Sequence, residues 1–334
     1  MKIYRKIAAS AGPIACTIIT AFIAGACAKV KTVKVEEPWP IAFNTMVQNS
    51  VKSAFEGETF PDAAVLHVTG DHVFNGVRTN LFLNTSFTKN TDGKWAGDKY
   101  WPAGGVMDFC AYYDNRESQT PKTVTPSWTN AQRLELTMAD NSTQQGDFLY
   151  GVANDKVASA AVPMTFYHAQ AWLQFTAKAT APEDFYLDRI EVLKPYTAGK
   201  FVVDNSKVDL EAYWTDLTKH MTGEPAAATD VKVPGWNGGT VAASTATAPT
   251  IIGSGLLLPA QETTKFVIYY KYKTGTDGGN PTYTPVYKYT YNLARGQWEM
   301  GKKYIYNITF NNNQIVIDTD VEDWTSAPQE NVDL

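Results

Sequence analysis

The chain has 334 residues, 44% of them apolar, which is enough for one large domain or two of about 150 residues each. The formal net charge is −5, and Lys2, Arg5 and Lys6 are the only charged residues before residue 27, so the chain from residue 27 onward carries −5 − 3 = −8. This acidic balance argues against a nucleic-acid partner, which needs a basic surface to neutralise phosphates.

The first residues have the pattern of an export signal. The three basic residues precede an apolar run over residues 7–26, which is broken by Gly12 and Pro13 and ends in Ala24-Gly25-Ala26-Cys27. Small residues before a cysteine resemble a lipobox. Three interpretations are open: a lipoprotein signal, a signal cleaved without lipidation, and an uncleaved transmembrane anchor. The helix break and the terminal small residues favour the first.

Cys27 is therefore the predicted site of lipid attachment, with residues 1–26 as signal peptide and residues 27–40 as an extended, charged tether. Two or more acyl chains hold a protein stably in a membrane, whereas one holds it only marginally. We expect an outer-membrane lipoprotein at the cell surface. Cys16 leaves with the signal, so Cys110 is the only other thiol and no structural disulfide is available.

Short strands joined by turns are predicted for the rest of the chain. Leu134, Leu136 and Met138 alternate with polar residues, as in a half-buried strand. Residues 274–281 contain Gly, Asn and Asp, which tolerate positive φ, and predict a hairpin. Other strands are expected over residues 64–69, 79–87, 106–113, 148–152, 164–177 and 185–193. The predicted class is all-β.

Two domains are predicted, over residues 41–195 and 196–334. Their boundary is placed near Pro195, where a stretch containing Pro, Gly and small residues follows a predicted strand. Within the second domain, residues 240–250 are small and polar and predict a surface loop. Residues 209–221 carry apolar side chains at a spacing that fits a short helix, the one candidate helix outside the signal.

Four segments in the same order resemble the fimbrillin-like family of the Bacteroidales, the type V pilins. They are Tyr100-Trp101-Pro102-Ala103-Gly104-Gly105-Val106-Met107-Asp108-Phe109-Cys110-Ala111-Tyr112-Tyr113, then Gly146–Gly151 with Val162–Phe175, then Leu256–Gln261, and finally Trp298–Phe310 with Val321–Trp324. Each is short, but the ordered set spans residues 40 to 325. The resemblance implies two β-sandwich domains of transthyretin-like topology and a fimbrial subunit that serves adhesion.

The resemblance also implies assembly by strand exchange, in which a protomer loses its first strand and a segment from another subunit fills the groove. The matching segment is Trp39–Val47, with Ile41, Phe43 and Val47 expected to face inward. Relatives can be cut after a basic residue beyond this strand. No arginine lies between Arg5 and Arg78, so arginine-specific processing lacks a site there.

The C-terminal residues predict a hairpin with one buried face. Ile315, Ile317 and Val321 share a face of the last strand, which follows a strand ending at Phe310. The predicted donor segment is Val321–Leu334, whose last residues hold only Val332 and Leu334 as apolar inserts.

Catalytic and cofactor motifs were sought and none was identified, so the chain is predicted not to be an enzyme, to bind no cofactor and to bind no metal. Its four histidines, at positions 67, 72, 168 and 220, lack zinc-site spacing. Trp236, in a Gly-rich loop, is the predicted exposed aromatic residue for sugar binding. The alternative function is therefore a surface lipoprotein that binds glycan or host protein without polymerising, and a hydrolase is a more distant third.

Overall fold

The computed structural model describes residues 39–47, 60–120, 122–140, 145–206, 210–218, 230–294, 296–311 and 314–324. These residues form strands almost throughout, with one short 3₁₀ helix at Pro182–Asp184, which confirms the predicted all-β class. No helix within these ranges is long and apolar enough to cross a membrane. Cys27, the signal peptide and most of the tether lie outside the described residues, as does His220.

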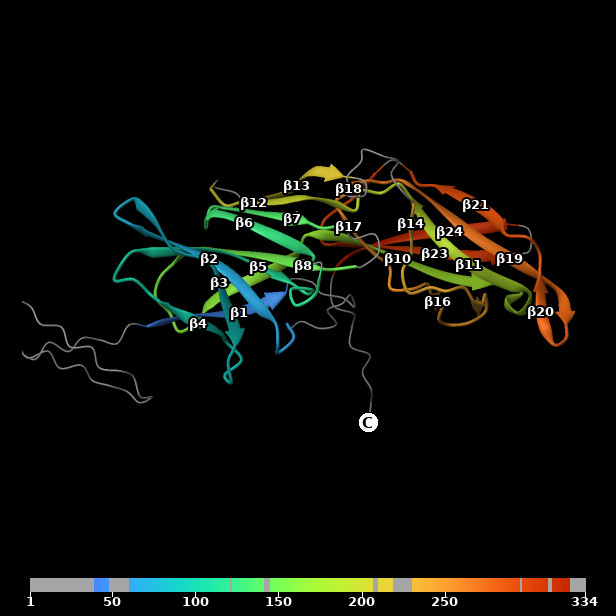
Figure 1. Ribbon diagram of the computed structural model, residues 1–334, viewed down its shortest axis with the longest axis horizontal. Helices are drawn as coiled ribbons and strands as arrows, with labels where there is room; N and C mark the ends of the chain where they lie inside the picture. Colours follow the sequence, from blue (N-terminus) through green and yellow to red (C-terminus); the bar gives the residue numbers. More distant parts are fainter. Residues whose placement is uncertain are drawn as a thin grey trace, which may run out of the picture.

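Seven strands in the first half of the molecule form one closed sheet. Its order is β1-β4-β3-β2-β5-β8-β9, and parallel pairing of β9 with β1 completes the circuit. We call this the closed sheet (Figure 1). Its strands are β1 Pro40–Val47, β2 Val65–Phe74, β3 Val77–Lys89, β4 Trp95–Tyr100, β5 Val106–Asp114, β8 Phe148–Lys156 and β9 Val162–His168.

A second sheet of four strands packs against one flank of the closed sheet. Its order is β13-β12-β7-β6, with β6 Val124–Asn130, β7 Arg133–Met138, β12 Ala198–Asp204 and β13 Glu211–Thr218. Leu134, Leu136 and Phe201 from this sheet meet Cys110 and Phe148 from β5 and β8 in a common core. The alternation predicted for residues 133–138 is thus the inner face of β7.

The helix predicted over residues 209–221 was wrong, because β13 occupies residues 211–218 and residues 219–221 lie outside the described ranges. Trp214 packs against the four-stranded core, and its indole nitrogen donates a hydrogen bond to the Ala169 carbonyl oxygen at 2.7 Å. Pairing with β12 along the whole strand provides partners for the backbone hydrogen-bonding groups of β13. This tertiary pairing overrides the helical spacing of the apolar residues.

Two further sheets face each other in the second half of the molecule. One contains β10 Gln170–Ala179, β23 Lys302–Asn311 and β24 Gln314–Asp323, with the short strands β15 Ala242–Ala243, β16 Thr250–Ile251 and β17 Leu256–Pro259 on β10. The other contains β11 Phe185–Leu193, β14 Val231–Lys232, β19 Lys265–Asp277, β20 Asn280–Tyr283 and β21 Tyr287–Asn292. A separate pair is formed by β18 Gln261–Glu262 and β22 Gln297–Trp298.

Aromatic and aliphatic side chains of both sheets form the core of this C-terminal sandwich. Phe175 and Tyr306 from one sheet contact Phe266 from the other at ring-centroid distances of 5.2 Å. The predicted hairpin around residues 274–281 is confirmed as the β19–β20 turn. The predicted surface loop at residues 240–250 is exposed or partly exposed apart from Val241, which is buried in the sandwich core, and it contributes the two-residue strand β15, which pairs with β10.

The predicted domain boundary at residue 195 does not follow the strand pairing. β10 and β11 precede it yet belong to the C-terminal sandwich, whereas β12 and β13 follow it and pair through β12 with β7. The chain therefore crosses between the two halves more than once. Figure 1 shows the result as an elongated molecule, with the closed sheet toward one end and the β19–β20 hairpin at the other.

Candidate functional site

The first strand, β1, fills the closed sheet with two inward side chains. Ile41 and Phe43 are fully buried. The Phe43 ring makes edge-on contacts with Phe87 and Phe109, each at a centroid distance of 5.1 Å. Both predicted inward positions thus lie in the core, while the side chain of Val47 falls outside the described residues.

The backbone of β1 pairs on both sides. It runs antiparallel to β4 through three residue pairs, with a shift in register between Pro40 and Ala42, and parallel to β9 through five pairs from Phe43 to Val47. Its side chains add a hydrogen bond from the Trp95 indole nitrogen to the Thr45 hydroxyl at 2.8 Å. Loss of β1 would leave two unpaired strand edges and an open apolar slot above Phe87 and Phe109.

Arg78, the first arginine after the signal, has a structural role. Its guanidinium contacts the Asp108 carboxylate at 2.6 Å and the Asp71 carboxylate at 3.3 Å, across β2, β3 and β5. Asn80 donates a further hydrogen bond to Asp71 at 2.8 Å. Because the two carboxylates are buried and face each other across paired strands, the guanidinium compensates their charge.

The last strand, β24, is the edge of its sheet and pairs with β23 alone among the described strands. The pairing sets Ile315 opposite Phe310, Ile317 opposite Ile308 and Val321 opposite Tyr304, as the predicted hairpin requires. Ile315 and Ile317 are partly buried against the sandwich core, but Val321 is 56% exposed. The three residues thus form part of their own subunit's sheet.

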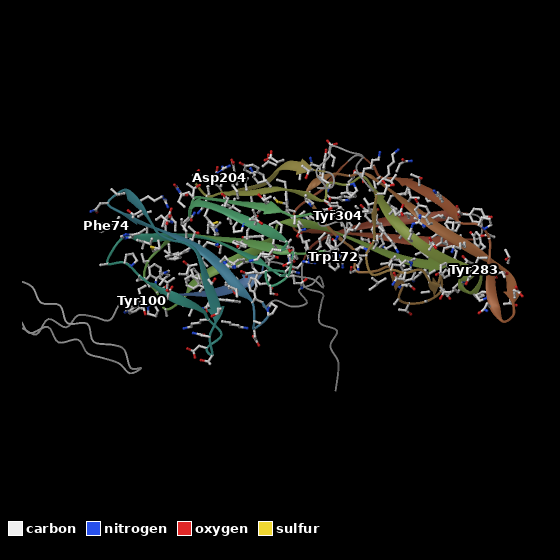
Figure 2. The ribbon with its side chains drawn as sticks, in the orientation of Figure 1. Phe74, Tyr100, Trp172, Asp204, Tyr283 and Tyr304 are labelled. Carbon is white, nitrogen blue, oxygen red and sulfur yellow. The ribbon has the colours of Figure 1, made fainter. Side chains whose placement is uncertain are left out.

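Trp324 fastens the end of β24 at the junction of the two halves. Its ring stacks on His168 at 3.7 Å and lies 5.7 Å from Trp172, and none of its surface is exposed. Figure 2 shows Trp172 and Tyr304 near the middle of the molecule. The Nδ1 atom of His168 lies 3.0 Å from the Asp147 carboxylate. The first residues of the predicted donor segment, Val321–Trp324, thus lie against their own subunit, and the rest of it, including Val332 and Leu334, lies outside the described residues.

Trp236 does not stand out from its loop as the sequence predicts. Its side chain is partly buried against the sandwich core, and its indole nitrogen donates to the Leu187 carbonyl oxygen at 3.1 Å. Reciprocal backbone hydrogen bonds between Leu187 and Gly239 draw the loop onto β11. The ring therefore offers less free surface for sugar stacking than a loop tip would.

The remaining polar candidates have local partners. His67 lies 2.6 Å from Glu117, and His72 from β2 lies 2.9 Å from the Gly104 carbonyl oxygen. In the described part of the chain, no group of three or more His, Cys, Asp or Glu side chains could hold a metal ion. Burial raises the pKa of the Cys110 thiol to about 12, so this cysteine is a packed side chain and not a nucleophile.

Comparison with known proteins relates this architecture to a family. No curated protein matches the chain. Solved structures of similar fold include a fimbrial protein from Bacteroides vulgatus, which is 16% identical with a TM-score of 0.56 over 84% of this chain and 99% of that one. Two others, from Bacteroides ovatus and Bacteroides uniformis, are described provisionally as cell adhesion proteins. They are 16% and 18% identical, have TM-scores of 0.52 and 0.50, and cover 88% and 86% of this chain and 100% and 99% of their own.

The family comparison covers most of the sequence. A model described as fimbrillin-like matches residues 58–324, from just after β1 to the buried Trp324. Such a match spans the closed sheet apart from its first strand, and the whole C-terminal sandwich. The chain belongs to the fimbrillin-like family.

Proposed function

We propose that this protein is a fimbrial subunit, exported as a lipoprotein and assembled at the cell surface by exchange of its first strand. Membership of the fimbrillin-like family supports a surface role among other pilin subunits. The observation that carries the exchange mechanism is the position of β1. It is the first described strand, it closes the sheet, and its two inward side chains are fully buried. In this proposal a strand from another subunit takes its place.

Energetics favour replacement of β1 over an empty groove. Burial of a side chain the size of Ile41 or Phe43 contributes roughly 1.5–3 kcal/mol, and each ladder hydrogen bond adds roughly 1 kcal/mol net. A vacant groove loses these contributions and exposes apolar surface. A donor strand restores them at the cost of ordering its own residues.

The C-terminal tail is the donor in this proposal. Residues 325–334 follow the buried Trp324, and an extended strand of ten residues spans about 33 Å. Val332 and Leu334 are two positions apart, as are Ile41 and Phe43, so both side chains of the tail can point into the same slot. Leu334 is smaller than Phe43 and fills its part of the slot less completely.

A reversible lock on β1 tests the exchange. Ala42 and Ala96 face each other on β1 and β4, so the Ala42→Cys/Ala96→Cys protein can be cross-linked between these strands. In a secreted form carrying Cys27→Ser, the oxidised protein should stay monomeric after a protease site placed within residues 48–59 is cut. Reduction should release β1 and allow filaments to form, as seen by negative-stain microscopy and size-exclusion chromatography.

The donor is tested separately with charge. Val332→Asp/Leu334→Asp places two carboxylates in the proposed inserts and should abolish filaments. Gln329→Asp/Asn331→Asp adds the same charges at positions of the opposite parity and should preserve them. Filaments that grow equally well from both variants would assign the donor to another segment. Filaments from the oxidised, cross-linked Ala42→Cys/Ala96→Cys protein would refute exchange of β1.

The lipid anchor is tested independently of assembly. Cells grown with radioactive palmitate should label the wild-type chain and leave the Cys27→Ala chain unlabelled, since Cys27 is the proposed acceptor. Equal labelling of both chains would contradict lipidation at Cys27.

A further inference from the structure

A small pocket opens in the C-terminal sandwich, beside the part of β19 that leads into the β19–β20 hairpin. Its volume is 340 Å³, and its walls come from four segments: the end of β10, the short 3₁₀ helix with the start of β11, β19, and the end of β23. Ligand pockets in proteins typically measure about 300–1,000 Å³. The pocket therefore suits a ligand the size of one sugar ring.

The floor of the pocket is aromatic and fixed. Phe185 and Phe310 are both almost fully buried, and their rings lie 4.2 Å apart. Tyr272 stands at the mouth with 36% of its surface exposed, and its ring lies 6.0 Å from that of Phe185. Tyr270 and Tyr287 pack beside it at 5.7 Å and 5.9 Å, which holds the exposed ring in place.

The rim offers both an acceptor and a donor of hydrogen bonds. Asp184 is exposed on the 3₁₀ helix, and its carboxylate makes no hydrogen bond or ion pair with any other described residue. Asn311 accepts a hydrogen bond from the Thr180 hydroxyl through its side-chain oxygen at 3.0 Å. That contact orients the carboxamide, and its nitrogen makes no hydrogen bond to another described residue, so it can donate to a ligand.

We infer that this pocket binds a neutral hexopyranose. The apolar face of a sugar ring packs on an aromatic side chain, as Tyr272 offers. Each sugar hydroxyl both donates and accepts, which matches a carboxylate beside a carboxamide nitrogen. A cationic amine could contact Tyr272 and Asp184, but an ammonium group only donates hydrogen bonds. The Asn311 amide nitrogen, which is also a donor, would then have no acceptor on the ligand. The inference rests on the proposed function of a surface fimbrial subunit and adds a sugar ligand to it, in this pocket and not at Trp236, where the sequence predicts sugar binding.

Titration of the purified mature protein with single hexoses tests the inference. The probes are galactose, glucose, mannose and N-acetylglucosamine, and their binding is measured by ligand-observed NMR. Each sugar is added up to about 10 mM, ten times the Kd of about 1 mM expected for a single hexose. At least one should bind saturably. Tyr272→Ala and Asp184→Asn should each weaken it tenfold or more, while Tyr213→Ala, which removes a tyrosine of similar exposure on β13, should leave it unchanged.

A second variant separates sugar from cation. Asn311→Asp replaces the donor by a second acceptor, so it should weaken hexose binding and strengthen binding of lysine methyl ester. Absence of hexose binding, or hexose binding indifferent to Tyr272→Ala, overturns the inference, as does preferential binding of the amine. Filament formation by Tyr272→Ala should match the wild type. A protein that binds hexose but forms no filaments would refute the assembly proposal and leave the pocket standing.

Discussion

The first and last described strands occupy opposite situations in the same fold. β1 lies between two partners, and its inward side chains Ile41 and Phe43 have no exposed surface. β24 has one partner, and its solvent-facing positions include Asp318, Asp320 and Glu322. An unpaired edge invites association, and charged side chains discourage it. The proposed exchange of β1 would therefore open a groove between two strands, whereas β24 already presents an edge on which charged side chains discourage association.

The largest difference should appear when the two strands are truncated at matched positions. Phe43→Ala empties a closed aromatic cluster and should lower the free energy of unfolding by about 3–5 kcal/mol. Ile317→Ala, on the partly buried face of β24, should cost about 1–2 kcal/mol, because solvent and neighbouring side chains can fill the space. Urea denaturation of both variants measures the contrast, and equal losses would contradict the distinction between a core strand and an edge strand.

Trp324 decides how firmly β24 is held. Trp324→Phe keeps an aromatic ring over His168 but fills less of the space beside Trp172, so it should cost about 1–3 kcal/mol. Amide hydrogen exchange should become faster near β24 and remain unchanged in β1. A uniform increase across both strands would show that Trp324 supports the whole molecule and not the end of one strand.

The sequence predicted much of both terminal strands, the first through its resemblance to the fimbrillin-like family and the last through local alternation. Ile41 and Phe43 are inward as expected, and the pairing of Tyr304 with Val321 follows from two period-2 segments around a short turn. A hairpin is a local structure, so its register is encoded within some twenty residues. The same reasoning found the β19–β20 hairpin.

Long-range pairing could not be predicted in this way. β1 pairs in parallel with β9, and β10 pairs in parallel with β23, although each pair is more than a hundred residues apart in the chain. Period-2 alternation gives the face of each strand but not its neighbour. For the same reason the sequence did not indicate the crossing at residue 195 or the stacking of Trp324 on His168. The pocket beside Tyr272 combines four segments and left no sequence signal.

Alkaline pH should weaken the sheet that supports β1. Cys110 follows Phe109, a contact of Phe43, and burial raises the pKa of its thiol from 9.0 to about 12. Above pH 9 the unfolded chain loses this proton while the folded chain keeps it, so stability is lost as the pH rises from 9 toward 12. By pH 10 the loss is about 1 kcal/mol. Denaturant titrations at pH 7 and pH 10 measure this. Between these pH values the wild type should lose about this much more free energy of unfolding than Cys110→Ala, which has no thiol to ionise.

The smallest effect on stability, and the sharpest test of the protected edge, concerns the acidic face of β24. Asp318→Asn/Glu322→Gln should change the free energy of unfolding by less than about 0.5 kcal/mol, since both side chains are exposed. It should nevertheless increase self-association, because two copies meeting along β24 repel each other less when only Asp320 and Asp323 keep their charge. Asp92→Asn/Asp98→Asn removes the same charge from exposed positions near the β3–β4 turn and should leave association unchanged.

Sedimentation velocity at low salt distinguishes the self-association of the β24 variant from that of this control. Because salt screens exposed charges, self-association of the wild type should rise toward that of the β24 variant as the ionic strength increases. If it does not, something other than charge prevents association along β24.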